Sequence, residues 1–231
     1  MRKPAKRRSN KAKDTATHVN VSQAEKAYDL IEEMIVSLKL KPGSRISEKF
    51  LSEQLGIGRT PVREALQKLA YEGTVTITPR SGITISEIDM TDQFRLIEVR
   101  REMERIMAKR AAQFSTQEER NTFLTLAEEF LKVAPTNDVD RFIPTDRDYN
   151  QLLASAARNR YAQMSMNIIQ AQTRRFAYLY FAHFGDMKRI CELHANISRA
   201  IGEGDEKRAG EASDELIDYI EEYTTRTIKS I

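Results

Sequence analysis

The sequence has very little cysteine and no long hydrophobic segment, and both shortages exclude whole classes of protein. Its 231 residues contain one cysteine, Cys191, so an intramolecular disulfide is excluded and a reducing, cytoplasmic compartment is expected. No apolar run approaches the ~18 residues that a membrane-spanning helix needs, and no secretory signal follows the start. With 31% charged and 40% hydrophobic residues, the composition predicts a soluble globular protein of one large domain or two ordinary ones.

Sequence motifs of the common enzyme classes are also absent. We find no phosphate-binding P-loop, no glycine pattern for a dinucleotide and no nucleophile elbow, and no nucleophile is paired with a base. Cys191 has Glu192 and His194 close by, which suits a metal ligand, but a buried inert thiol is the simpler interpretation. The sequence therefore predicts a protein that is not an enzyme.

Positive charge is concentrated at the N-terminal end of the chain. Residues 1–20 carry seven Lys or Arg against Asp14 alone, residues 21–86 are nearly balanced, and residues 87–231 carry an excess of acid. The first 20 residues have no apolar periodicity and are predicted to form a disordered basic tail. Such a tail either keeps the chain in solution or adds affinity for the phosphate groups of nucleic acids, whatever their base sequence.

The segment 21–86 has the pattern of a winged helix-turn-helix domain. An amphipathic helix precedes the turn "KPGSR", and "EKFLSEQL" predicts a second helix that ends at a glycine. The short turn "GIG" leads to a third helix, where we expect Thr60 to be the N-cap and Pro61 the first helical residue. Two alternating strands around "PRSG" then predict a β-hairpin, which we call the wing.

Two arginines, Arg59 and Arg63, flank the start of the third helix. The helix macrodipole disfavours cations at that end, so a negatively charged partner is expected there. In a helix-turn-helix protein this end of the third helix enters the major groove, where arginine contacts guanine edges and phosphates. The segment is therefore predicted to bind double-stranded DNA.

The stretch "PGSRISEKFLSEQLGIGRTPVREALQKLAYEGTVTITPRSGITI" resembles the N-terminal domain of GntR-family bacterial transcription regulators. The proline-glycine turn, LSEQLG, RTPVREAL and the P-x-x-G wing carry this resemblance. The resemblance implies DNA contacts from seven residues, which are Arg45, Lys49, Arg59, Thr60, Arg63, Arg80 and Gly82.

From residue 90 onward the pattern is wholly helical. Leu96, Val99, Met103 and Ile106 predict the apolar face of the first long helix. Short polar connections separate the stretches of helical periodicity, which run near 92–113, 116–133, 139–157, 160–182, 186–202 and 205–229. The predicted fold class is mainly α, with an N-terminal winged helix-turn-helix and an antiparallel bundle of about six helices over residues 90–231.

Polar side chains occur on helix faces of this bundle that should be apolar. Asp146 and Asn150 share a face with Leu153, His194 interrupts an isoleucine-rich face, and Arg100 lies beside an apolar face. Taken singly, each is explained by hydrogen bonds within a core. Because buried polar groups are costly unless they meet each other or a ligand, together they predict a polar cavity.

The helical segment resembles the all-helical, FCD-type ligand-binding domain of the FadR subfamily. The matching stretches are "IEVRREMERIMAKRAA", "TDRDYNQLLASAARN" and "ELHANISRAIGEGDEKRAGEASDELIDYI". The resemblance implies an inward-pointing Arg100 suited to a carboxylate effector. We expect at least one of the adjacent Arg174 and Arg175 to face outward, and the sequence leaves open which. The candidate effector-binding residues are Arg100, Asp146, Tyr149, Asn150, Arg174, Arg175, Tyr178 and His194.

Many members of that subfamily bind a divalent metal ion through one Asp and three His. Asp146 and His194 match two of these ligands, whereas Asn150 and Leu216 stand where the first and last His are expected. Leucine cannot ligate a metal and an amide oxygen is a weak ligand, so the set falls short of a closed transition-metal shell. No cofactor is certain, and a metal held by Asp146, Asn150 and His194 stays an open alternative.

Together these features predict a DNA-binding transcription regulator, with a repressor favoured, whose operator affinity is set by a small carboxylate metabolite. We expect a cytoplasmic homodimer that pairs through its helical domain and has no membrane partner. Two alternatives stay open. One is an architectural DNA-binding protein with an inert dimerisation bundle, and the other is an enzyme that uses Arg100, Asp146 and His194 as an acid–base cluster.

Overall fold

Two groups of elements make up residues 22–80 and 82–230, the part of the chain that the computed structural model describes. The predicted basic tail, residues 1–20, lies outside the described residues. The N-terminal group contains α1 (Gln23–Val36), β1 (Arg45–Ile46), α2 (Glu48–Leu55), α3 (Arg59–Tyr71), β2 (Val75–Thr78) and β3 (Gly82–Ile85). The helical group contains α4 (Met90–Phe114), α5 (Gln117–Val133), the 3-10 turn η1 (Ala134–Thr136), α6 (Val139–Ala156), α7 (Arg160–Phe184), α8 (Met187–Glu203) and α9 (Glu206–Ser230).

Side-chain caps set the beginnings of most helices in the N-terminal group. Ser22 forms a capping box with Glu25 at the start of α1, and the Ser47 hydroxyl accepts a hydrogen bond from the Phe50 amide at the start of α2. Helix α2 ends at Gly56, which has a positive φ of 63° that favours glycine.

The predicted start of α3 is wrong by two residues. Gly58 is the N-cap and Arg59 the first helical residue, so Thr60 lies inside the first turn and does not cap it. Pro61 is then the third helical residue. Proline is tolerated there because the amide groups of the first turn have no partner within the helix.

The wing forms an antiparallel hairpin, as the alternating pattern predicted. Strand β2 pairs with β3, with Ile77 opposite Ile83. The structure adds β1, which pairs with the other edge of β3 and places Arg45 opposite Thr84. A strand of two residues is too short to show alternation, so no sequence pattern predicted it.

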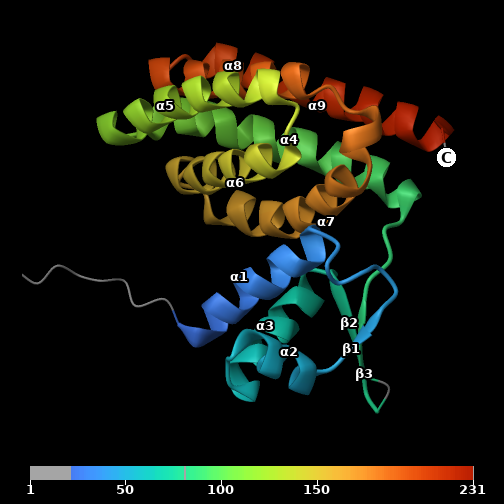
Figure 1. Cartoon of the computed structure of the whole chain (residues 1–231). Coiled ribbons are helices and arrows are strands. Elements are labelled where there is room, and N and C mark those ends of the chain that lie inside the picture. Colours follow the sequence, from blue (N-terminus) through green and yellow to red (C-terminus); the bar gives the residue numbers. More distant parts are fainter. Residues whose placement is uncertain (1–21, 81, 231) are drawn as a thin grey trace, which may run out of the picture.

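Each group has its own hydrophobic core, and the predicted fold class is confirmed. Helices α2 and α3 bury Leu51, Val62, Leu66 and Leu69. In the bundle, α8 packs against α5 and α9, and α4 packs against α9. Figure 1 shows α7 at the base of the bundle, directly against α1 of the N-terminal group. Among the described helices, none is both long enough and apolar enough to cross a membrane.

The apolar face predicted for α4 is confirmed at two of its four positions, since Leu96 and Met103 are partly buried and pack against the bundle core. It is wrong at the other two. Val99 and Ile106 are 49% and 39% exposed, whereas Ile97, Glu104 and Met107 are buried. A shift of one residue turns a helix face by about 100°. The prediction missed the centre of the buried face because that face is partly polar, and because Val99 and Ile106 place apolar residues on an exposed face.

Candidate functional site

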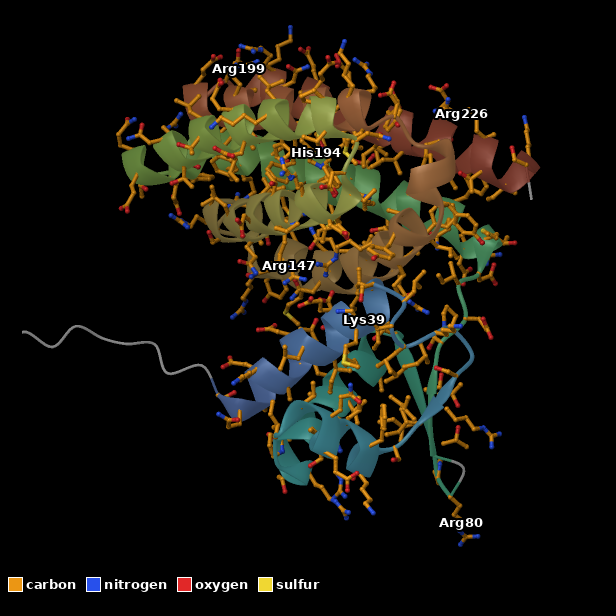
Figure 2. The ribbon with its side chains drawn as sticks, in the orientation of Figure 1. Lys39, Arg80, Arg147, His194, Arg199 and Arg226 are labelled. Carbon is orange, nitrogen blue, oxygen red and sulfur yellow. The ribbon has the colours of Figure 1, made fainter. Side chains whose placement is uncertain are left out.

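The residues predicted to contact DNA all belong to the N-terminal group, on its helices α2 and α3, on its strands and in the turn of the wing. Figure 2 shows Arg80 at the tip of the wing, far from the helical group. A side chain must be exposed if it is to contact DNA, so exposure is a necessary condition for each predicted contact. The contacts themselves stay a prediction. All of the seven residues that the sequence predicted are exposed, namely Arg45, Lys49, Arg59, Thr60, Arg63, Arg80 and Gly82.

Arg63 is held in place by a carboxylate that the sequence did not single out. Its Nε donates to Glu48 Oε1 and its terminal nitrogen donates to Glu48 Oε2, both at 2.8 Å. The hydrogen bond from Arg63 lowers the pKa of the Glu48 carboxyl. This bidentate pair fixes the direction of the guanidinium on α3, and Glu48 competes with any nucleic acid for it.

The turn of the wing depends on two residues with positive φ. Arg80 has a φ of 66° and Gly82 a φ of 95°. A positive φ is strained for arginine and easy for glycine. Gly82 therefore lets the chain reverse tightly and project Arg80 outward.

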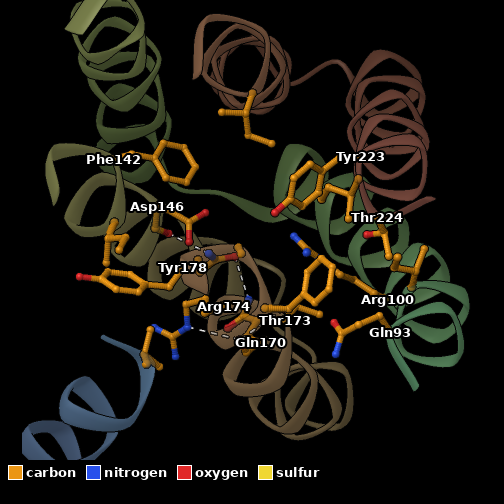
Figure 3. Close-up of a pocket in the computed structure, with 18 of the residues that line it drawn as sticks. Gln93, Arg100, Phe142, Asp146, Gln170, Thr173, Arg174, Tyr178, Tyr223 and Thr224 are labelled. Carbon is orange, nitrogen blue, oxygen red and sulfur yellow. Dashed lines mark hydrogen bonds between the residues drawn. The ribbon is translucent and has the colours of Figure 1, made fainter. Parts of the chain in front are cut away.

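A cavity of about 90 Å³ lies inside the helical group, between α4, α6, α7, α8 and α9. A single water needs roughly 10–15 Å³ of such space, so the cavity has room for a small organic molecule. Val36, the last residue of α1, also lines it, so the N-terminal group contributes to its wall. Figure 3 shows polar side chains converging among aromatic ones. Of the eight predicted effector residues, those that line the cavity are Arg100, Asp146, Asn150, Arg174, Tyr178 and His194.

Asp146 and His194 form a buried pair in the cavity wall. His194 Nε2 lies 3.2 Å from Asp146 Oδ1, and its Nδ1 lies 2.8 Å from the carbonyl oxygen of Ile190. Since both neighbours are acceptors, both contacts are hydrogen bonds only when both ring nitrogens carry a proton. Burial alone would raise the pKa of the Asp146 carboxyl. The hydrogen bond and charge of His194, together with the charges of Arg174 and Arg100, outweigh burial, so the pKa is lowered overall.

Asn150 is already used by its neighbours. Its Nδ2 donates to the Asp146 carbonyl oxygen at 2.8 Å, and its Oδ1 accepts from Gln170 Nε2 at 2.8 Å. Leu216 is fully buried in the core. Among the described residues, no group of three His, Cys, Asp or Glu could hold a metal ion. The side chains present therefore do not fit the metal shell that the family resemblance implies.

Each arginine of the cavity has a buried carboxylate partner that the sequence analysis missed. Arg100 Nε donates to Glu104 Oε1 at 2.6 Å, and the side chains are 12% and 2% exposed. Arg174 donates to Glu32, which lies on α1. The i, i+4 spacing of Arg100 and Glu104 was a readable signal. Nothing local in the sequence pairs residue 174 with residue 32.

Arg175 and Tyr149 do not line the cavity, so two predictions for the effector site are wrong. Arg175 is fully buried and donates to the carbonyl oxygen of Ser86, just after β3. Neither Arg174 nor Arg175 points freely outward, because α1 and the chain after β3 cover this side of α7. Tyr149 packs edge-on behind His194, with ring centroids 5.4 Å apart, and supports the ring.

Cys191 is an inert core residue, as the simpler interpretation predicted. It is fully buried, and its Sγ lies 3.8 Å from Met187 Sδ. Burial raises the pKa of the thiol to about 12, with smaller contributions from Asp146 and Glu192. A thiol with so little thiolate is a poor nucleophile and a poor metal ligand.

Comparison with known families identifies both groups of elements. The FCD domain matches residues 95–219, and the gntR family of bacterial regulatory proteins matches residues 23–85. The chain belongs to the GntR family. It is a DNA-binding transcription regulator of the GntR type with an FCD domain, as the motifs predicted.

Several relatives of this GntR-family regulator are themselves regulators. It is 27% identical over 198 residues to the Escherichia coli transcriptional repressor RspR, and the match covers 85% of each chain. It is 38% identical over 86 residues to the Nta operon transcriptional regulator of Aminobacter aminovorans, covering 37% and 41% of the two chains. The structure of Escherichia coli McbR/YncC has the same fold, with a TM-score of 0.73 at 20% identity over 89% of this chain and 98% of that one.

Proposed function

We propose that the chain is a repressor whose affinity for operator DNA is controlled by a small carboxylate bound in the cavity. The observation that carries this proposal is the presence of Arg100 and Arg174 in one cavity wall. Guanidinium groups bind carboxylates through two parallel hydrogen bonds. Val36 connects the same cavity to the DNA-binding half, so occupancy has a direct path to α1.

The cavity wall favours a ligand with an apolar body and one negative charge. Apolar and aromatic side chains dominate the lining, and they include Ile97, Phe142, Ile143, Phe176, Ile190 and Tyr223. Arg100 and Arg174 each already have one carboxylate partner, so the wall has little positive charge left and every further charge on the ligand adds to the cost of burying it. An aromatic or short aliphatic monocarboxylate fits these conditions.

A thermal-shift screen of monocarboxylates with their amides as matched controls tests this function. A ligand at about 100 times its Kd stabilises the native state by about 2.7 kcal/mol, which corresponds to a rise in Tm of roughly 5–10 °C. We expect such a rise for an acid and none for its amide. If no acid raises Tm, the architectural alternative with an inert bundle is favoured instead.

The DNA-binding unit is proposed to be a homodimer joined through the helical domain. Helix-turn-helix proteins read inverted half-sites with two recognition helices, one from each copy. The exposed Val99 and Ile106 of α4 supply apolar surface suited to such contact. Light scattering at operator-binding concentrations is expected to give twice the chain mass. A monomer under those conditions would contradict the proposal.

We infer that the cavity works without a resident metal ion. Asp146 and His194 bind each other, and the Asn150 amide is engaged by Gln170. A chelator is therefore expected to leave Tm unchanged, and elemental analysis of untagged protein to find no stoichiometric metal. Stoichiometric zinc, nickel or manganese that is lost in Asp146→Ala would show that this inference is wrong.

A further inference from the structure

One side chain, Arg174, touches both the cavity and the DNA-binding half. It lines the cavity from α7, and its terminal nitrogen donates to Glu32 on α1. Figure 3 shows Arg174 between the other cavity residues and the ribbon of α1. The two partners are 142 residues apart in the sequence, and their side chains are 22% and 6% exposed.

Glu32 depends on Arg174 because its surroundings hold a second acid. Glu72, at the end of α3, is also buried and accepts a hydrogen bond from the Tyr28 hydroxyl at 2.9 Å. Burial raises the pKa of Glu72, the charge of Glu32 raises it further, and Arg174 lowers it. Removing the Arg174 guanidinium would leave the carboxylates of Glu32 and Glu72 buried near each other without this counter-charge, which is strongly unfavourable.

Two other hydrogen bonds join the two halves in the described part of the chain, and neither uses a side chain that lines the cavity. Arg175 donates to the carbonyl oxygen of Ser86, and Gln172 Nε2 donates to the carbonyl oxygen of Glu72 at 3.1 Å. Neither Arg175 nor Gln172 lines the cavity. These hydrogen bonds to backbone carbonyl oxygens keep the two halves attached. The Arg174 side chain, in contrast, can contact a ligand in the cavity directly.

We propose that the Arg174–Glu32 ion pair is the link through which a carboxylate in the cavity changes the orientation of the DNA-binding half. The bound carboxylate competes with Glu32 for the Arg174 guanidinium. Glu32 then moves away with α1, because it has lost its counter-charge, and the backbone contacts of α7 act as the hinge. This inference rests on the proposed function, since it needs an anionic ligand in that cavity.

Reciprocity gives the proposal a quantitative consequence. If the anion and Glu32 compete for Arg174, the bound anion weakens the Arg174–Glu32 ion pair by some factor. Removing the charge of Glu32 must then increase the affinity of the cavity for the anion by the same factor. Allosteric coupling in proteins is typically about 5- to 150-fold. Glu33, the next residue on α1, is exposed, so Glu33→Gln is a matched control for the loss of one negative charge.

The first experiment measures hydrogen exchange of the full-length chain without ligand. We expect Glu32→Gln and Arg174→Gln each to speed the exchange of amides in the second half of α1 at least about fivefold. The double variant should show no further increase, and Glu33→Gln should match the wild type. Unchanged exchange of α1 in both single variants would overturn the proposal whatever the ligand.

The second experiment uses benzoate, an aromatic monocarboxylate, as the probe in calorimetric titrations of the same proteins. Glu32→Gln is expected to bind benzoate at least about fivefold more tightly than the wild type or Glu33→Gln, and Arg174→Gln more weakly. Equal affinity of wild type and Glu32→Gln would overturn the link and leave the proposed function standing. Failure of benzoate to bind the wild type would overturn both the link as stated and the proposed ligand class.

Discussion

Arg100→Met is expected to lower the free energy of unfolding by about 3–5 kcal/mol, because it leaves Glu104 as an uncompensated charge in the core. The Glu104 side chain is 2% exposed, and Arg100 is its one ion-pair partner among the described residues. Methionine keeps much of the apolar length of arginine, so packing changes little. Urea unfolding followed by circular dichroism measures the effect.

The double variant Arg100→Met/Glu104→Met separates the stranded charge from the loss of contacts. Replacing a buried ion pair with apolar residues is often neutral or stabilising, so the double variant should regain most of the lost stability. A single Arg100→Met variant as stable as the wild type would contradict this account. The comparison also matters for function, since a misfolded Arg100 variant would lose its effector response without any loss of a ligand contact.

Arg63→Ala is expected to weaken binding to a selected operator by about 1–3 kcal/mol and to relax the preference at one base pair. The Arg63 guanidinium is exposed on α3, and Glu48 fixes its direction through two hydrogen bonds of 2.8 Å. A guanidinium group held in one direction is suited to donate two hydrogen bonds to the two acceptor atoms of guanine in the major groove. Fluorescence anisotropy on the operator and on single-base variants measures the loss.

Two further variants distinguish base reading from phosphate anchoring. Arg63→Lys keeps the charge and loses the planar fork, so it should resemble Arg63→Ala if Arg63 reads a base. Glu48→Gln removes a competing charge, so it should strengthen binding to operator and random DNA alike. An equal loss on both kinds of DNA in Arg63→Ala would show that Arg63 anchors a phosphate instead.

Local patterns in the sequence were enough for most of the fold. Helical spacing and short polar connections predicted the helices of the bundle, and the structure shows that α5 begins with a capping box formed by Thr116 and Glu119. The alternating strands around "PRSG" predicted the wing, and the isoleucine-rich face of α8 predicted that His194 is buried. These features depend on residues within a few positions of each other, so they are legible without knowledge of the partner surfaces.

Only the tertiary structure decided which polar residues share a site. The sequence indicated that Arg174 and Arg175 could not both face inward, because adjacent residues are about 100° apart on a helix. The structure buries Arg175 and largely buries Arg174 because α7 is covered on one side by the bundle and on another by α1. Likewise, the polar inner face of α4 and the pairing of Arg174 with Glu32 depend on surfaces brought together from distant parts of the chain. A helical period reports which residues share a face, but the packing of the other elements determines what that face meets.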